Sequence, residues 1–115
     1  MLYRGSCHCG ALAFEVEGEL TGAVACNCSI CSRKGALLWA VPRDRLRLLT
    51  SEDGIGRYVF NRQAIEHRFC RTCGIHPYAE DADAGADRAA YVNIRCLENL
   101  DPASVPTQAF DGRSM

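Results

Sequence analysis

Apolar and polar side chains alternate along several short stretches of the chain, which is the pattern of half-buried β-strands. In residues 11–17, Leu12, Phe14 and Val16 share one face while glutamates occupy the other. Residues 89–96 repeat the pattern near the end of the chain. The alternation predicts strands over residues 11–17, 45–50, 57–61, 64–69 and 89–96, and the continuous apolar run 36–41 predicts a buried strand.

Turn residues separate these segments, and helical periodicity is weak throughout. Residues 51–56 are predicted to be a loop, and residues 81–88, which are polar and alanine-rich, a hairpin loop. Single helical turns are expected only after Cys28 and near residues 101–104. Many short strands joined by turns predict a mostly β fold, built as a small β-sandwich.

Length and charge narrow the classes of protein to consider. The chain has 115 residues, enough for one domain over residues 1–115, and its formal net charge is −1. That balance argues against a nucleic-acid-binding protein, because neutralising phosphates needs a basic face. No stretch approaches the roughly 18 apolar residues of a membrane helix, and the first residues lack a signal-peptide core. We therefore expect a cytoplasmic protein that binds neither nucleic acid nor membranes.

Eight cysteines are the unusual feature of the composition, and seven of them fall in three tight clusters. The clusters occupy residues 7–9, 26–31 and 70–73, and Cys96 stands apart. Structural disulfides are rare in the reducing cytosol, and pairing within a Cys-x-Cys sequence would strain a disulfide. Neighbouring thiolates suit a metal ion instead, because zinc takes sulfur ligands at about 2.3 Å. The spacing therefore favours metal binding over disulfides.

The first predicted metal site combines Cys7, Cys9, Cys70 and Cys73. Cys7 and Cys9 are two residues apart in an extended segment, so their sulfurs point to the same side. Cys70 and Cys73 form a knuckle in which Gly74 lets the backbone fold close to the metal. Four thiolates complete a structural zinc site, with iron as the alternative ion. Such a site would join segments about sixty residues apart in the chain.

The second predicted metal site has three sulfurs within six residues, from Cys26, Cys28 and Cys31. Three protein ligands with one open position are typical of catalytic zinc. A zinc ion with three thiolates is a weak Lewis acid and suits thiol chemistry better than hydrolysis. The alternative is a second structural site closed by another side chain. The candidates for that fourth ligand are Cys96, His8, His67 and His76.

Three cysteine-containing segments resemble those of a known family. They read Gly-Ser-Cys-His-Cys-Gly-Ala over residues 5–11, Cys-Asn-Cys-Ser-Ile-Cys over 26–31 and Phe-Cys-Arg-Thr-Cys-Gly over 69–74. They resemble the glutathione-dependent formaldehyde-activating enzyme / centromere protein V family, and residues 91–97 and 110–112 resemble its later segments. The resemblance implies a β-rich, zinc-clasped architecture similar to Mss4. It also implies two zinc ions per chain, with the second cluster as the active site.

The activity implied by the resemblance is that of a carbon–sulfur lyase, joining glutathione and formaldehyde into S-hydroxymethylglutathione. Zinc at the second cluster would lower the pKa of the thiol, whose sulfur then adds to the aldehyde carbon. Glutathione carries two carboxylates, so Arg33 and Lys34, which follow Cys31, are the expected contacts for this small-molecule partner.

Two other functions remain open at the level of sequence. One is a two-zinc binding module without chemistry, or a carrier of a thiol adduct, because thiols add to formaldehyde readily without a catalyst. The other is a metal or redox sensor that uses an exposed three-cysteine site. The sequence also leaves open the oligomeric state and the identity of the true thiol and aldehyde.

Overall fold

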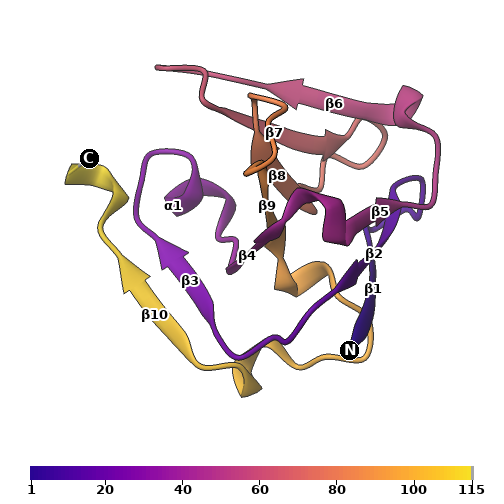
Figure 1. Cartoon of the computed structure of the whole chain (residues 1–115), viewed down its shortest axis with the longest axis horizontal. Helices are drawn as coiled ribbons and strands as arrows, with labels where there is room; N and C mark the ends of the chain where they lie inside the picture. Colours follow the sequence, from indigo (N-terminus) through magenta and orange to yellow (C-terminus); the bar gives the residue numbers. More distant parts are fainter. Residues whose placement is uncertain (115) are drawn as a thin grey trace.

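Ten β-strands form two sheets in the computed structural model, which describes residues 1–114 (Figure 1). The strands are β1 (Leu2–Ser6), β2 (Ala13–Glu17), β3 (Ala23–Cys26), β4 (Leu38–Pro42), β5 (Leu46–Leu48), β6 (Ile55–Tyr58), β7 (Ile65–Cys70), β8 (Tyr78–Asp81), β9 (Ala89–Asn93) and β10 (Thr107–Phe110). A single α-helical turn, α1, spans Cys31–Lys34. Short 3₁₀ turns lie at Arg43–Arg45, Glu52–Gly54, Ile94–Cys96, Pro102–Ser104 and Gly112–Ser114.

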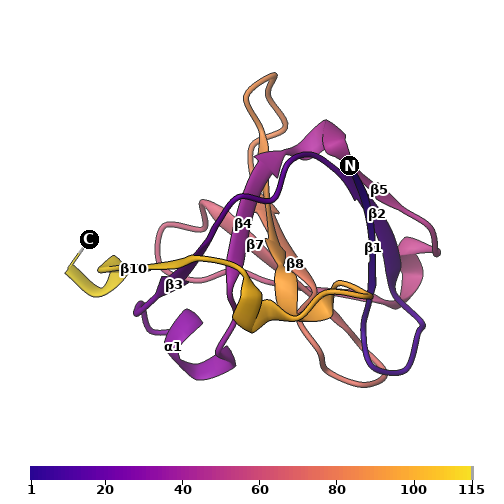
Figure 2. The ribbon, with the colours of Figure 1, turned by 90° about the horizontal axis from the view of Figure 1, so that it is seen from below.

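The smaller sheet has the strand order β1-β2-β5, and the larger has β10-β3-β4-β9-β8-β7-β6. Neighbouring strands are antiparallel except β10, which runs parallel to β3. The smaller sheet lies at one side of the molecule, whereas α1 and the end of the chain lie at the other (Figure 2). The prediction of a mostly β, two-sheet fold is confirmed.

The core lies between the two sheets and is filled by the alternating apolar residues. Phe14 and Val16 of β2 are completely buried, and so is Val92 of β9. Trp39 and Val41 of β4 complete the contact between the sheets. Successive side chains of a strand point to opposite faces of the sheet. Alternating apolar residues therefore give each sheet one apolar face, which packs in the core.

Several predicted boundaries need correction. The run 36–41 is not a strand buried on both faces: in β4 the side chains of Trp39 and Val41 are buried, but Ala40 between them is exposed. The strand predicted over 89–96 ends at Asn93, whose side chain accepts a hydrogen bond from the Arg95 backbone N–H and starts a 3₁₀ turn.

The other differences concern where strands begin and which strands were missed. The strand predicted over 57–61 lies at Ile55–Tyr58, so the predicted loop over 51–56 is shorter. The connection after β8 is a loop, and the turns after Cys28 and near Pro102 are present. Strands β1, β3, β8 and β10 were not predicted. Within residues 1–114, none of the helices has the length and apolar character needed to cross a lipid bilayer.

Candidate metal centres

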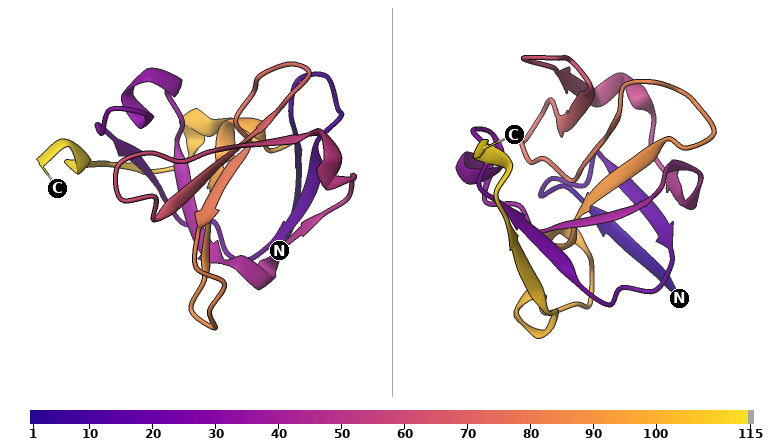
Figure 3. Two further views of the ribbon diagram at one scale, coloured as in Figure 1. Left: turned by 90° about the horizontal axis from the view of Figure 1, so that it is seen from above. Right: turned by 60° about the vertical axis from the view of Figure 1, so that its left-hand side comes forward.

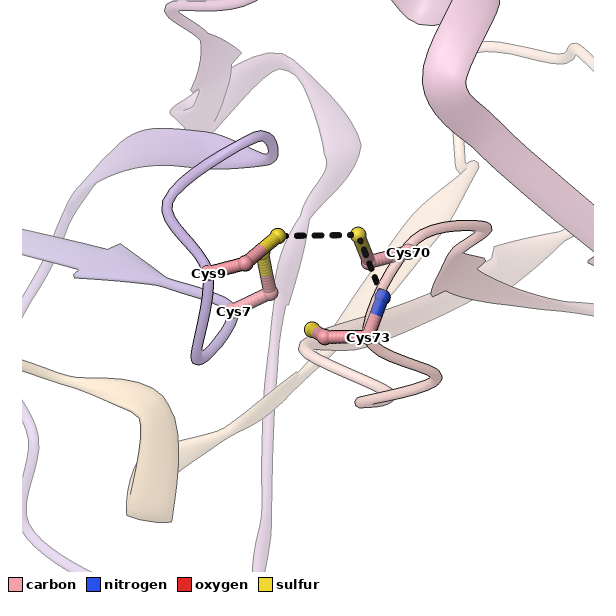
Figure 4. Close-up of side chains that lie close together, drawn as sticks. All are labelled: Cys7, Cys9, Cys70 and Cys73. Carbon is pink, nitrogen blue, oxygen red and sulfur yellow. Dashed lines mark hydrogen bonds between the residues drawn. The ribbon is translucent and has the colours of Figure 1, made fainter.

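The first cluster brings together four sulfurs from two distant parts of the chain (Figure 4). Cys7 and Cys9 lie in the loop after β1, and Cys70 and Cys73 lie in the knuckle that ends β7. The Cys7 and Cys9 sulfurs are 3.7 Å apart, and the Cys9 and Cys70 sulfurs are 3.6 Å apart. Tetrahedral zinc with bonds of about 2.3 Å needs sulfurs about 3.8 Å apart, so this donor set fits zinc.

Backbone N–H groups prepare the knuckle sulfurs for the thiolate form. The N–H groups of Thr72 and Cys73 each donate to the Cys70 sulfur over 3.4 Å. Hydrogen bonds from the backbone of Ile75, and then of Cys9, lower the pKa of Cys73 to about 6. Because a metal ligand must be deprotonated, these donors favour metal binding before any ion arrives.

The second cluster is formed by Cys26 at the end of β3, Cys28 in the following loop and Cys31 at the start of α1. Their sulfurs all lie within 4.8 Å of one another. Burial raises the pKa of Cys31 to about 12, with further contributions from Cys28. Burial also works against ionisation of Cys28, but hydrogen bonds from the backbone and side chain of Cys31 lower its pKa overall. Three close thiols fit a zinc ion, whose binding would release a proton from Cys31.

Cys96, a candidate fourth ligand for the second cluster, lies on the side of the first cluster instead. Burial, and then the nearby charges of Cys7 and Cys73, raises the pKa of Cys96 to about 11. Its position follows from the 3₁₀ turn after β9, which leads into a bridge between Gly5 and Leu97. Among residues 1–114, no fourth cysteine, histidine, aspartate or glutamate joins Cys26, Cys28 and Cys31.

None of the three histidines joins the second cluster as a ligand. His8 is exposed in the loop between the first two ligands. His67 is buried, and its Nδ1 lies 3.3 Å from Nζ of Lys34. The His76 ring stacks on Phe69, with 5.3 Å between ring centroids. The described residues therefore supply only sulfurs to the second cluster.

An open cleft of about 540 Å³ lies beside the second cluster and extends towards the first. Its walls come from α1, from the hairpin of β6 and β7, and from the knuckle; they are Ile30, Arg33, Lys34, Tyr58, Phe69, Gly74 and His76. Ile30 stands between two ligands of the second cluster, and Gly74 follows the last ligand of the first. Segments that carry the two clusters therefore contribute to the walls of the cleft, although none of the clustered cysteines lines it.

Two cations face this region from α1. Burial lowers the pKa of Lys34, whereas the sulfurs of Cys31 and Cys28 raise it. Burial, and then the charge of Lys34, lowers the pKa of His67 to about 4, so at neutral pH the ring accepts a hydrogen bond from Lys34. Within residues 1–114, Lys34 forms no ion pair with a carboxylate. Arg33 is exposed and donates to the Ser29 carbonyl over 2.7 Å.

The sequence predicted the cations of this cleft but not its aromatic wall. The aromatic wall consists of Tyr58, Phe69 and His76. The sequence pattern of their strands and loops does not indicate that these segments lie close to α1. One sequence feature could have indicated the position of the Phe69 ring. Gly56 pairs with Phe69 across β6 and β7. A β-carbon on Gly56 would lie 2.2 Å from the Phe69 ring, so the glycine leaves the space that the ring fills.

Comparisons with known proteins identify the family and a structural relative. The sequence model of the glutathione-dependent formaldehyde-activating enzyme family matches residues 2–111. A Rhodobacter sphaeroides protein, solved by crystallography as a structural-genomics target, is 33% identical in sequence and superposes with a TM-score of 0.78. The match covers 91% of this chain and 99% of that chain. The chain belongs to the glutathione-dependent formaldehyde-activating enzyme family.

Proposed function

We propose that the protein is a cytoplasmic, zinc-dependent carbon–sulfur lyase of the S-(hydroxymethyl)glutathione synthase type. It would join a small thiol such as glutathione to formaldehyde or a similar aldehyde. The observation that carries the proposal is the second cluster, where three sulfurs converge without a fourth ligand from residues 1–114. The neighbouring cleft is lined by two cations, Arg33 and Lys34. Family membership supports the same reaction class.

Cys26, Cys28 and Cys31 would hold the catalytic zinc, and the four sulfurs of the first cluster a structural one. Zinc bound at the second cluster would supply a position for the substrate sulfur and lower its pKa. Lys34 and Arg33 would bind the substrate carboxylates, because both line the cleft. Lys34 has no carboxylate partner among the described residues. The apolar ring of Phe69 and the side chain of Ile30 would limit water around the reacting atoms.

The reaction balances without a redox partner. The thiol proton leaves to solvent, and the sulfur lone pair forms the new bond to the aldehyde carbon. The carbon–oxygen π pair moves to oxygen, which takes a proton from solvent and becomes the hydroxyl of the product. The residues of the cleft act by binding and orienting the thiol, which converts a bimolecular encounter into a directed addition.

Metal counting combined with a calorimetric titration of glutathione tests the proposal. We expect two zinc ions per chain and glutathione binding that Cys28→Ser abolishes. Cys96→Ser is the matched control, because this thiol belongs to neither cluster, and it should bind glutathione as the unchanged protein does. Two bound zinc ions without any thiol binding would contradict the proposal and leave a zinc-binding module.

A rate assay then separates catalysis from carriage of an adduct. The rate of adduct formation must exceed the spontaneous rate and must fall to that background in Cys28→Ser. Glutathione binding without acceleration would assign the protein as a thiol-adduct carrier.

A further inference from the structure

The end of the described chain reaches the second cluster alongside β3. Strand β10 runs parallel to β3, and the pairing places Phe110 opposite Cys26. The Asn27 backbone N–H donates to the Phe110 carbonyl over 3.1 Å and extends the pairing beyond the strand. The end of the chain and the loop before α1 lie side by side (Figure 3).

Asn27, which stands between two ligands of the second cluster, binds this segment through both ends of its side-chain amide. Its Nδ2 donates to Oδ1 of Asp111 over 2.9 Å. Its Oδ1 accepts from the Arg113 backbone N–H over 2.8 Å. The hydroxyl of Ser114 donates to the other Asp111 oxygen over 2.7 Å and fixes the carboxylate. The amide therefore fastens the cysteine loop to residues 110–113.

Gly112 packs its backbone directly against two of the ligands. A β-carbon built on Gly112 would lie 2.5 Å from the Cys26 sulfur and 3.1 Å from the Cys28 β-carbon. The backbone of Gly112 does not adopt a positive φ, so the reason for glycine here is space and not conformation. No other residue type fits without moving the segment or the sulfur.

Burial in the core does not explain why this segment is held in place. All four residues of β10 are exposed, and Phe110 is 47% exposed. The side-chain contacts of the segment beyond β10 are instead concentrated on the loop that carries Cys26 and Cys28. An exposed segment with its contacts on a ligand loop acts on the geometry of that loop.

We infer that residues 110–113 form a wall of the second metal site, and that Asn27 and Gly112 are positioning residues for it. Together they hold the Cys26 and Cys28 sulfurs at the separation that a metal requires. Groups that orient metal ligands without touching the metal commonly change affinity by about 10–100-fold when removed. The inference relies on the metal assignment of the proposed function but not on the reaction.

The test compares Gly112→Ala and Asn27→Ala with Gly85→Ala, a glycine with no atom within 4 Å of its β-carbon position and no positive φ. Each full-length variant is loaded with Co²⁺, and the sulfur-to-cobalt absorption bands are followed during titration and during competition by a chelator. Asn27→Ala introduces no clash, so it remains informative if Gly112→Ala folds poorly.

We expect both test variants to bind the second Co²⁺ about 10–100-fold more weakly, with the first equivalent and its spectrum unchanged. Gly85→Ala should match the unchanged protein. If both variants bind two metals with unaltered affinity, the inference is wrong but the proposed function still stands. Simultaneous loss of both metals would also overturn it, since the segment would then support the whole fold. A single metal in the unchanged protein would contradict the proposed function as well.

Discussion

Glu80 is the most constrained charge in the molecule. It is 3% exposed, yet its carboxylate accepts hydrogen bonds from Arg43 over 2.6 Å and from Arg68 over 3.0 Å. Arg88 lies 3.5 Å from the same carboxylate. These arginines come from the turn after β4, from β7 and from the loop before β9, so one carboxylate ties together three parts of the larger sheet. A buried charge is tolerated only when it is paired in this way.

Replacing Glu80 should therefore be costly. We expect Glu80→Ala to lower the free energy of unfolding by about 3–5 kcal/mol, because it leaves Arg43 and Arg68, which are largely shielded from solvent, without a carboxylate partner. Denaturant titration measures the loss. Glu15→Ala, which removes an ion pair with the exposed Arg47, is the control and should cost less than about 1 kcal/mol. Equal losses in the two variants would contradict this reading of Glu80.

His67 makes the stability of the fold depend on pH. Burial, followed by the charges of Lys34 and His76, lowers its pKa from 6.5 to about 4. Between these values the unfolded chain binds the proton more tightly than the folded chain does, so stability falls as pH drops through this window. Above pH 6.5 the ring is neutral in both states and has no effect.

Between pH 6.5 and 4 the free energy of unfolding of the unchanged protein falls. We expect His67→Gln to reduce that fall by about 1–3 kcal/mol. Glutamine retains an acceptor for Lys34 but does not titrate. Both proteins keep the same cysteine ligands, so proton-driven metal release is common to them and cancels in the comparison. Denaturant titrations at several pH values give the two slopes, and identical slopes would show that His67 does not carry the effect.

At the scale of the strands, two glycine–phenylalanine pairs set how closely neighbouring strands pack. Gly5 of β1 pairs with Phe14 of β2, and Gly56 of β6 pairs with Phe69 of β7. A β-carbon on Gly5 would lie 2.5 Å from the Phe14 ring and 3.0 Å from a backbone carbonyl. In each pair the aromatic ring covers the glycine across the strands and fills the space a side chain would take.

The Gly5–Phe14 pair leaves little room for a side chain on Gly5. Phe14 is fully buried, so we expect Gly5→Ala to cost about 1–3 kcal/mol through overpacking. Gly54→Ala is the control, since no atom lies within 4 Å of its β-carbon position. Thermal unfolding of the metal-loaded proteins provides the measurement. A melting temperature for Gly5→Ala equal to that of the control would show that the strand pair can relax.

The strands also show what the sequence could and could not predict. Strands with alternating apolar residues, such as β2 and β9, were predicted because the alternation indicates which face of the strand is buried. Strand β8 was missed because its Glu80 is buried by distant arginines, which no local pattern reports. Strand β10 was missed because it is exposed throughout and has no apolar face. The cysteine clusters were accessible from spacing, whereas the aromatic wall of the cleft and the role of Gly112 depend on contacts between distant segments.

At the scale of the whole molecule, the first cluster joins the loop after β1 to the end of β7. These segments belong to different sheets, so a metal there holds the two layers together. Structural zinc contributes about 10–16 kcal/mol of apparent binding free energy, whereas a domain is stable by only about 5–15 kcal/mol. The metal at the first cluster is therefore expected to decide whether the protein folds.

Cys70→Ser should consequently give unfolded or insoluble protein, because the fully buried Cys70 supplies a ligand that links the two segments. Cys96→Ser, which removes a thiol outside both clusters, should fold and keep its metal. Far-UV circular dichroism and metal analysis of the soluble fractions compare the two. A well-folded Cys70→Ser with unchanged metal content would remove the structural role of the first cluster.

The central claim is that the second cluster binds a metal with a coordination position that a thiol can enter. X-ray absorption at the zinc edge tests this most directly, because it counts sulfur neighbours around the metal. We expect an average between three and four sulfurs per zinc in the thiol-free protein, rising to four when glutathione is added. Four sulfurs per zinc before any thiol is added, or an average that glutathione leaves unchanged, would contradict it.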